Sequence, residues 1–283
     1  MRVLFYLVLA ALALPAPAAE PFFFIQAADT QFGMFASNRG FEQETANFEF
    51  LVATANRLKP AFLIVCGDLV NRPGDPAQAA EYSRIAARLD RSIRLYNVAG
   101  NHDVGNQPTP ALLAIYRERF GPDWYSFRAG DLFAVVLNSG LIHSPQKAPQ
   151  EYAKQEAWLR GELEKAGKNG ARHRVVFQHH PLFILDPGEP DVYFNIPLER
   201  RRKYLGLFGE YGVSHVFAGH HHANNVGKAG PIEMVTTGPV GKPLGKDGSG
   251  FRVVIVRDTG IEHRYYEFGW APDRIDLAPE KSR

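Results

Sequence analysis

Five short apolar stretches of this 283-residue chain each end in a cluster of acid, amide or imidazole side chains. The stretches have the length and composition of buried strands. They are Phe22–Ala28, Phe62–Cys66, Leu95–Ala99, Val175–Phe177 and His215–Ala218. The carboxyl ends of neighbouring strands in an open α/β sheet share one edge, so polar residues far apart in the sequence can meet there. The pattern therefore predicts an α/β fold with one site at that edge.

The five clusters contain aspartate, asparagine and histidine, which are the ligand types that hold two borderline divalent or trivalent cations close together. The clusters are Asp29-Thr30-Gln31, Gly67-Asp68, Gly100-Asn101-His102-Asp103, Gln178-His179-His180 and Gly219-His220-His221-His222. Their order along the chain predicts a dinuclear metal centre that hydrolyses a phosphoester.

Each residue type suggests a role at such a centre. Asp68 follows Gly67, whose missing side chain lets a cation approach the backbone, and a carboxylate can bridge two cations with its two oxygens. Asn101 offers a neutral oxygen, and Asp29 completes the ligands of the first metal. Imidazole nitrogens come from His179, His220 and His222. Alternation turns the remaining histidines of these clusters away from the metals, which favours supporting or packing roles for His180 and His221.

His102 is predicted to serve the chemistry rather than the metals. It adjoins Asn101 yet can stay uncoordinated, and the carboxylate of Asp103 is expected to fix its tautomer and raise its basicity. This pair suits a general acid, or a cation that stabilises the transferring phosphoryl group. The hypothesis is in-line attack on phosphorus by a hydroxide that bridges the two metals.

These clusters resemble the ordered motifs of the calcineurin-like metallophosphoesterases, and the likeness covers essentially all of the chain after residue 19. It is closest to the branch of calcineurin-like phosphoesterase domain-containing protein 1, on the stretches Phe24–Gly33, Gly100–Asn106, Tyr193–Asn195 and His263–Tyr266. The resemblance implies a four-layer α/β/β/α sandwich of two mixed sheets flanked by helices. It also implies that Asp29 and His222 bind one metal, that Asn101, His179 and His220 bind the other, and that Asp68 binds both.

One position departs from the broad family pattern. Many members place a histidine two residues after the first aspartate, and this chain has Gln31 there. An amide oxygen can coordinate, but it is a weaker and harder ligand than imidazole. Gln31 is therefore expected to change the affinity or the identity of the first metal. Manganese, iron and zinc all remain candidates for the two ions.

Several elements outside the clusters can be predicted. Apolar residues at helical spacing predict a helix over Phe48–Leu58, which Pro60 stops, and further helices over Gln150–Ala166 and from Pro197 to Gly212. Turn residues between apolar runs predict two hairpins. The hairpins pair Tyr125–Phe127 with Leu132–Leu137 and Phe251–Val256 with Ile261–Phe268.

The first residues read as a secretory signal. Arg2 precedes the apolar stretch Val3–Leu14, and Pro15 and the small residues Ala16–Ala19 follow. We expect residues 1–19 to be removed and residues 20–283 to form a single domain in the periplasm or outside the cell. The stretch is shorter than the roughly 20 residues that span a bilayer, so no stable membrane anchor is expected after cleavage, although an uncleaved anchor is the alternative.

Composition and charge argue against other classes of function. The net charge is +2, so binding to a nucleic-acid scaffold is not expected. The single cysteine, Cys66, lies in a strand-like run and is expected to be inert core. The basic run Arg200–Lys203 is expected to be a solvated helix face. Nothing in the sequence decides the oligomeric state.

Substrate recognition is the least constrained feature. The segments Leu182–Asn195 and Thr236–Gly250 are placed to wall the site, and four residues are candidates for contact with substrate: Asn106, Tyr193, Asn195 and Asn224. The aromatic residues there could equally plug a loop. The substrate is expected to be a phosphorylated small molecule or a phosphoprotein, as a phosphomonoester or a phosphodiester. The alternative function is a non-catalytic protein that binds metal or a phosphate ligand on the same fold.

Overall fold

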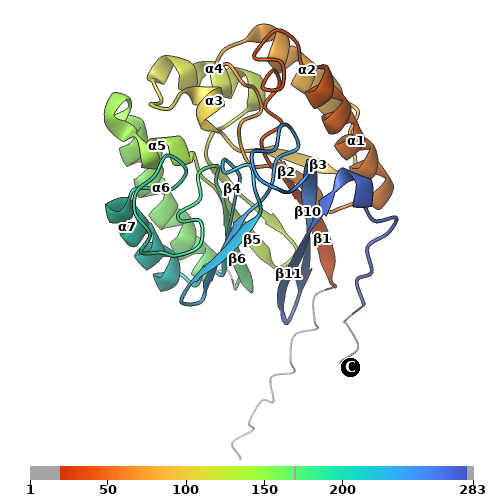
Figure 1. Ribbon diagram of the computed structural model, residues 1–283. Coiled ribbons are helices and arrows are strands. Elements are labelled where there is room, and N and C mark those ends of the chain that lie inside the picture. Colours follow the sequence, from red (N-terminus) through yellow and green to blue (C-terminus); the bar gives the residue numbers. More distant parts are fainter. Residues whose placement is uncertain (1–19, 169, 279–283) are drawn as a thin grey trace, which may run out of the picture.

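The computed structural model describes residues 20–168 and 170–278, which form two sheets with helices on their outer faces (Figure 1). The first sheet has the strand order β11 (Gly260–Glu267), β10 (Gly250–Arg257), β1 (Phe22–Ala27), β2 (Phe62–Val65) and β3 (Arg94–Asn97). The second has the order β4 (Tyr125–Ala129), β5 (Leu132–Val136), β6 (His173–Phe177), β7 (His215–Ala218), β9 (Ile232–Thr236) and β8 (Asn225–Ala229). Both sheets are mixed, with parallel strands at their centres.

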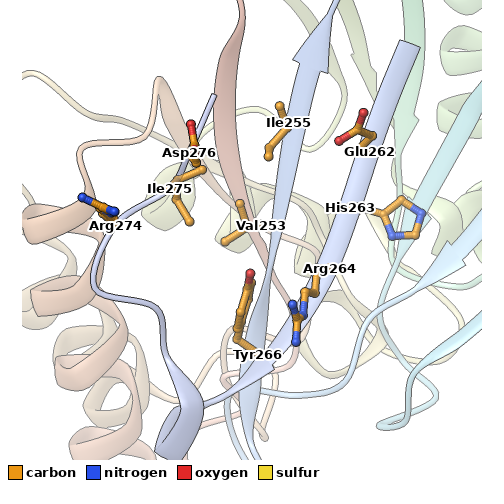
Figure 2. A pocket seen from close by; sticks show the side chains of 9 residues that line it. All are labelled: Val253, Ile255, Glu262, His263, Arg264, Tyr266, Arg274, Ile275 and Asp276. Atoms are coloured by element: carbon orange, nitrogen blue, oxygen red, sulfur yellow. The ribbon is translucent and has the colours of Figure 1, made fainter. Parts of the chain in front are cut away.

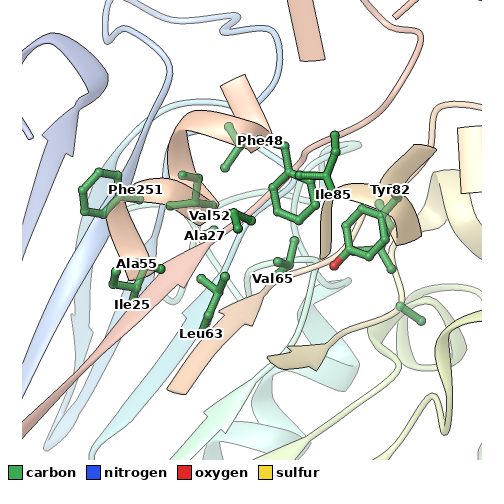
Figure 3. Packing of buried hydrophobic residues seen from close by; sticks show 14 of the residues in the cluster. Ile25, Ala27, Phe48, Val52, Ala55, Leu63, Val65, Tyr82, Ile85 and Phe251 are labelled. Carbon is green, nitrogen blue, oxygen red and sulfur yellow. The ribbon is translucent and has the colours of Figure 1, made fainter. Parts of the chain in front are cut away.

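The helices divide between the two sheets. Those before β4 are α1 (Glu42–Leu58), α2 (Pro76–Ala86), α3 (Asn101–Val104) and α4 (Pro110–Phe120). Those that follow β5 are α5 (Ser139–His143), α6 (Pro149–Lys168) and α7 (Leu198–Glu210), and two short 3-10 turns, η1 (Pro145–Lys147) and η2 (Phe268–Trp270), complete the set. Apolar residues of α1 and α2 pack on the first sheet (Figure 3). Those of α4 belong to the same cluster, and those of α6 and α7 pack on the second sheet. The predicted four-layer α/β/β/α fold is thus confirmed.

A third hydrophobic cluster lies between the two sheets. Side chains alternate along β1, so Phe23 and Ile25 face the helices while Phe24 faces the second sheet. The ring of Phe24 stacks on Phe62 with centroids 4.5 Å apart and meets the edge of Phe177 at 5.7 Å. Central strands such as β1, β2 and β5 are buried on both faces, which explains why they read in the sequence as continuous apolar runs.

The predicted elements are largely confirmed. Both hairpins form, β4 with β5 and β10 with β11, and the helices over 150–166 and 198–210 are α6 and α7. Helix α1 begins earlier than expected, at Glu42, and α6 runs one residue past Gly167. The polar clusters do not share one sheet edge as first expected: three follow strands of the first sheet, and two follow β6 and β7 of the second.

One surface prediction is wrong in part. Arg201, inside the basic run at the start of α7, is fully buried. Its guanidinium donates to the carbonyls of Ile196, Pro187 and Glu189 at 2.7–3.1 Å. A buried guanidinium is tolerated when its N–H groups have hydrogen-bond acceptors. Here the carbonyls of the loop before α7 take the place that water would have around an exposed arginine.

The chain's last described segment crosses the outer face of β10 and β11. Arg57 of α1 donates to the carbonyls of Pro272 and Asp273, and Arg257 donates to that of Ala278. Between these anchors the segment borders a half-open pocket of about 560 Å³ above the sheet, lined by apolar residues and by charged residues of both signs (Figure 2). Its lining includes Val253, Ile255, Tyr266, Glu262, Arg264, Arg274 and Asp276.

The predicted signal peptide lies outside the described residues. Within the part of the chain that is described, no helix is long and apolar enough to span a bilayer.

His215 should make stability depend on pH. Burial at the start of β7 lowers its pKa to about 4, so at pH values between there and the ordinary pKa near 6.5 the unfolded chain binds a proton that the folded chain does not. The free energy of unfolding is therefore not reduced by His215 above about pH 6.5. At about pH 5 this group lowers it by about 2 kcal/mol. Urea unfolding of metal-free protein at these two pH values should show a smaller drop in the free energy of unfolding for His215→Gln than for the wild type. An equal loss in both proteins would contradict the assignment.

Candidate metal centre

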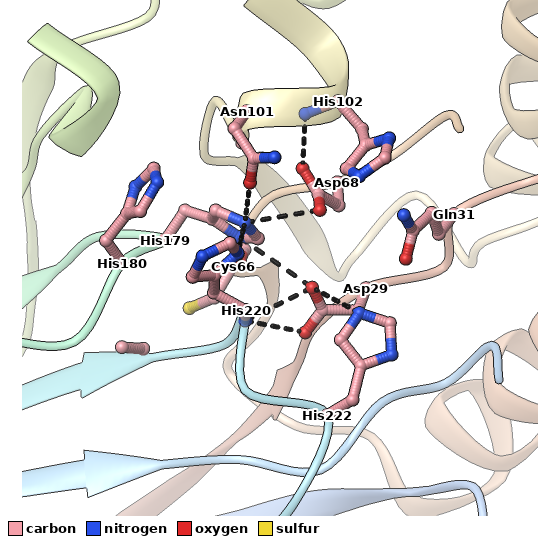
Figure 4. Close-up of polar contacts among 12 residues, drawn as sticks. Asp29, Gln31, Cys66, Asp68, Asn101, His102, His179, His180, His220 and His222 are labelled. Atoms are coloured by element: carbon pink, nitrogen blue, oxygen red, sulfur yellow. Dashed lines mark hydrogen bonds and ion pairs between the residues drawn. The ribbon is translucent and has the colours of Figure 1, made fainter. Parts of the chain in front are cut away.

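The predicted ligands converge at one end of the sandwich, where loops leave β1, β2, β6 and β7 and where α3 begins (Figure 4). Asp29, Asp68 and His179 are at most 1% exposed, and His220 and His222 are at most 3% exposed. Figure 4 shows side chains from both sheets pointing toward one another across a small space. The site therefore exists only where the two sheets meet.

Two groups of side chains among the described residues can each hold a metal ion. One consists of Asp68, His179 and His220, and the other of Asp29, Asp68 and His222, with the donor atoms of each group within 4.8 Å of one another. Asp68 belongs to both groups, as a bridging carboxylate would. The Oδ1 atom of Asn101 lies 2.9 Å from Nε2 of His179, which places it with the first group.

Every predicted imidazole ligand is oriented by a backbone carbonyl. His179 Nδ1 lies 2.9 Å from the Cys66 carbonyl, His220 Nε2 lies 3.2 Å from that of Tyr193, and His222 Nδ1 lies 2.6 Å from that of Lys242. A carbonyl only accepts, so each of these nitrogens carries the hydrogen. The second nitrogen of each ring faces the centre and is the one that would bind a metal, which is the arrangement that metal-binding histidines require.

The amide of Asn101 is oriented in the same way. Its Nδ2 donates to Oδ1 of Asn106 at 2.8 Å and to the hydroxyl of Tyr193 at 3.1 Å. The oxygen therefore faces His179 and the metal site. Asn106 and Tyr193, predicted to contact substrate, thus also hold a predicted ligand, and Tyr193 is 52% exposed at the mouth of the site.

The surroundings of the Gln31 side chain fit a role as a metal ligand. Its side chain is 1% exposed, its Nε2 donates to Oδ1 of Asn71 at 3.1 Å, and its Oε1 is buried without a hydrogen-bond partner. A buried carbonyl oxygen without a donor is costly. A cation beside Asp29 would satisfy it, so the residues present fit a metal with Asp29, Asp68, His222 and Gln31 around it.

The backbone at these positions is strained. Among the described non-glycine residues, eight have positive φ, and five of them are predicted ligands: Asp29, Gln31, Asp68, His220 and His222. Left-handed backbone is uncommon for residues with a Cβ, and such outliers concentrate at functional sites. Hydrogen bonds hold the strained loops, for example from Asp29 N to the Gly67 carbonyl at 3.0 Å and from Gln31 N to the Asp68 carbonyl at 2.7 Å.

Glycines leave room for the carboxylates. A Cβ at Gly219 would lie 2.5 Å from Oδ2 of Asp29, and one at Gly100 would lie 2.2 Å from the backbone nitrogen of Asp68. Both contacts are shorter than real Cβ atoms make. Gly219 and Gly100 therefore allow Asp29 and Asp68 to lie against the neighbouring loops.

His102 and Asp103 do not form the expected pair. His102 donates from Nδ1 to the carbonyl of Asn71 at 2.8 Å, so Asn71 and not Asp103 fixes its tautomer. The Asp103 carboxylate instead accepts from the backbone N–H groups of Leu69, Val70 and Gly100 at 2.8–3.1 Å. Asp103 therefore shapes the loop that carries Asp68. The prediction of a catalytic role for Asp103 loses its basis, because backbone donors occupy both of its oxygens.

Opposite charges stabilise one another in the centre. Burial alone would raise the pKa of Asp68, but the imidazoles of His179 and His102 outweigh it and hold that pKa below its usual range. Burial alone would lower the pKa of His179, but the carboxylate of Asp68 raises it to about 9. The centre thus favours positive charge, which a cation can supply.

Two residues predicted to contact substrate have amides that are engaged elsewhere in the fold. Asn195 is fully buried, and its amide accepts from Val192 N and donates to Glu189, so it folds its own loop. Asn224 is bound at both ends of its amide, by the guanidinium of Arg252 at 2.8 Å and by Asp247 at 3.0 Å. Their positions in the sequence could not reveal these partners, which come from elsewhere in the fold.

The remaining cluster residues lie beside the centre. His180 is within 2.9 Å of the hydroxyl of Ser139, and its ring stacks on His143. His221 lies against Phe194 and within 2.9 Å of the Asn225 amide. Cys66 is buried, and burial raises the pKa of its thiol. Asn71 and the carbonyl of Lys242 are contributors that the sequence analysis missed, because neither lies in a cluster.

The fold and the metal-ligand geometry together define a metallophosphoesterase. A family model described as Calcineurin-like phosphoesterase matches residues 24–224. The chain belongs to this family and is a phosphoric ester hydrolase.

The relatives agree with the branch expected from the sequence. The bovine serine/threonine-protein phosphatase CPPED1 is 40% identical over 92% of this chain and 90% of its own length. The human protein of that name is 38% identical over the same shares, and the one from Danio rerio is 36% identical over 90% of this chain and 87% of its own.

Solved structures share the fold at low identity. Purple acid phosphatase PPD1 from yellow lupin has a TM-score of 0.67 at 12% identity, covering 89% of this chain and 52% of its own. A dimetal phosphatase from Danio rerio has a TM-score of 0.59 at 15% identity, covering 87% and 99%. At these identities the likeness establishes the fold.

Gly219→Ala should weaken metal binding, because its Cβ would displace the Asp29 carboxylate. We expect a loss of about 10-fold or more in the affinity for one metal, comparable to the loss of a supporting contact. Titration of metal-free protein with Mn²⁺ measures it. The control is Gly209→Ala in α7, where nothing lies within 4 Å of the new Cβ and where stability should rise by up to about 1 kcal/mol. Wild-type metal affinity in the Gly219 variant would refute the expectation.

Proposed function

We propose that this chain hydrolyses phosphomonoesters at a centre of two metal ions, chosen from manganese, iron and zinc. The observation that carries the proposal is the orientation of the predicted ligands: three imidazoles each donate one N–H to a backbone carbonyl and turn the other nitrogen toward a shared carboxylate. A protein that only packed these histidines in a core would not need this common orientation. Two cations bound there would lower the pKa of a water molecule between them and so supply a nucleophile near neutral pH.

His102 is the proton carrier in this proposal. Its Nδ1 is committed to the Asn71 carbonyl, so Nε2 is the atom that gives or takes a proton. Its backbone N–H also donates to Oδ1 of Asp68 at 2.8 Å, which fixes the imidazole beside the bridging carboxylate. Protonated His102 would stabilise the transferring phosphoryl group or protonate the leaving oxygen.

The proposed substrates include phosphoserine and phosphothreonine, since relatives at 36–40% identity are named serine/threonine-protein phosphatases. Tyr193 stands half-exposed beside Asn101, where it can contact the group that carries the phosphate. Small phosphorylated metabolites and phosphodiesters remain alternatives.

Metal-free protein supplied in turn with Mn²⁺, Fe²⁺ and Zn²⁺ should hydrolyse an aryl phosphate faster than its bis-aryl diester. Bound metal without any hydrolysis would favour the other function, a protein that binds metal or phosphate.

Replacing His102 should separate chemistry from metal binding. We expect His102→Gln to lower kcat by about 10²–10⁴-fold, the usual contribution of a positioned proton donor, and to leave the metal content unchanged. Elemental analysis and steady-state kinetics measure the two quantities. His221→Gln is the matched control, because His221 adjoins two predicted ligands but packs on Phe194, and its kcat should stay near wild type. A parallel loss of metal and turnover in the His102 variant would show that His102 is a ligand.

We also propose export through a cleaved signal at residues 1–19. The proposal is supported by the basic, apolar and small-residue order of that segment in the sequence. Expression of the full chain in a bacterium, followed by amino-terminal sequencing, should give a mature protein that begins after Ala18 or Ala19. A mature sequence that begins at Met1 would contradict export by cleavage.

A further inference from the structure

We propose that Gln31 is held in its metal-binding orientation by a chain of amide hydrogen bonds that runs from Gln78 through Asn38 and Asn71, here named the amide relay. The inference rests on the proposed metal centre and adds the residues that make a glutamine work as its ligand. None of the three supporting residues lies in a polar cluster of the sequence.

A glutamine ligand has a problem that a histidine ligand does not share. The two ends of its amide have nearly the same shape, but only the oxygen can bind a cation, while the NH₂ group repels it. Without an orienting partner, an amide beside a metal can turn either way. Gln31 therefore needs a hydrogen-bond acceptor that selects its nitrogen.

The relay begins at a fixed point on α2. The Oε1 atom of Gln78 accepts from the backbone N–H groups of Asn71 and Arg72 at 3.0 and 2.9 Å. A backbone N–H can only donate, so the atom that receives both must be the oxygen. The nitrogen of Gln78 then faces Asn38 and donates to its Oδ1 at 2.8 Å.

Each later orientation follows from the one before. Oδ1 of Asn38 also accepts from Nδ2 of Asn71 at 2.8 Å, so the oxygen of Asn71 faces Gln31. Gln31 donates from Nε2 to that oxygen at 3.1 Å, and its own Oε1 remains buried without a partner. Figure 4 shows the amide end of Gln31 directed into the site, with the oxygen on the side of Asp29. The backbone N–H groups of Asn71 and Arg72 thereby determine that the oxygen of Gln31, and not its nitrogen, faces the metal site.

The relay is held rigidly. Gln78 is 2% exposed, and a Cβ at Gly33 would lie 2.6 Å from its Nε2, so the space around the amide is filled. Asn38 has a left-handed backbone with φ 63° and donates from its N–H to the Gly33 carbonyl at 2.8 Å. The carbonyl of Asn71 meanwhile accepts from His102, so one loop positions both a predicted ligand and the proton carrier.

Gln78→Glu tests the direction of the relay. A carboxylate can still accept from both backbone N–H groups, but it cannot donate to Asn38. Asn38 and Asn71 should then turn over in sequence, and Gln31 should present its NH₂ group to the metal. We expect the affinity of one of the two sites for Mn²⁺ and Zn²⁺ to fall about 10–100-fold, the usual effect of losing a residue that orients a ligand. A negative charge acting only through its field would tighten metal binding, so unchanged or tighter binding at both sites would overturn the proposal.

Asn71→Leu supplies a second test that does not depend on the folding of the first variant. Alone, it should weaken one metal site by a similar factor. In a Gln31→His background the loss should be clearly smaller, because either ring nitrogen of an imidazole can bind a cation, whereas only one end of an amide can. An equal loss in both backgrounds would show that Asn71 acts through the general stability of the loop, and the proposal would fail.

Asn56→Leu is the matched control for lost amide hydrogen bonds. Asn56 is held at both ends by the backbone, donating to the Arg88 carbonyl at 2.9 Å and accepting from Asp90 N at 2.7 Å. Its loss should lower the melting temperature without changing metal affinity. Failure of the relay is separable from failure of the proposed function: wild-type protein that binds two metals but hydrolyses no phosphoester would refute the function, and the metal titrations would still decide the relay.

Discussion

The candidate metal centre depends on how the two sheets are held against each other, and the buried amide of Gln26 is one of the directional contacts that hold them. Gln26 lies in β1 and donates to the carbonyl of Ala218, the last residue of β7, at 3.0 Å. Its oxygen accepts from Thr237 at 2.6 Å. The aromatic and aliphatic contacts around it favour burial but not a particular register. A buried hydrogen bond does favour one register, since shifting the sheets would leave both partners unsatisfied.

This contact lies just below the site on both sides. Asp29 follows Gln26 closely in one sheet, and His220 follows Ala218 in the other, where its N–H donates to Asp29 at 3.0 Å. The same strand ends carry left-handed residues whose strain is of the order of 1 kcal/mol or more each. The inter-sheet core and the hydrogen bonds between loops offset that strain and position the predicted ligands. A site held by its surroundings in this way spends little binding energy on ordering its ligands.

The sequence reveals the parts of this site that are local. Asp68 and His220 were recognisable because a strand-like run and a glycine precede them, and the fold followed from the alternation of such runs with helical ones. What could not be predicted are partners brought together by tertiary packing. Asp103 was assigned to His102 because they are adjacent, yet backbone N–H groups take its carboxylate. Helix α2 was missed, although Asp75 before Pro76 is a strong start signal and caps the N–H groups of Ala77 and Gln78.

The two candidate metal positions offer different sets of donor atoms. One position is faced by His179 and His220 together with two oxygen ligands, Asp68 and Asn101. The other is faced by a single imidazole, His222, with oxygens from Asp29, Asp68 and Gln31. Imidazole suits zinc and iron, whereas a set richer in oxygen moves the preference toward manganese. A histidine at position 31 would remove most of this difference. The proposed amide relay keeps an oxygen there, so the fold around α2 would maintain the difference between the two candidate metal positions as well as the geometry of one ligand.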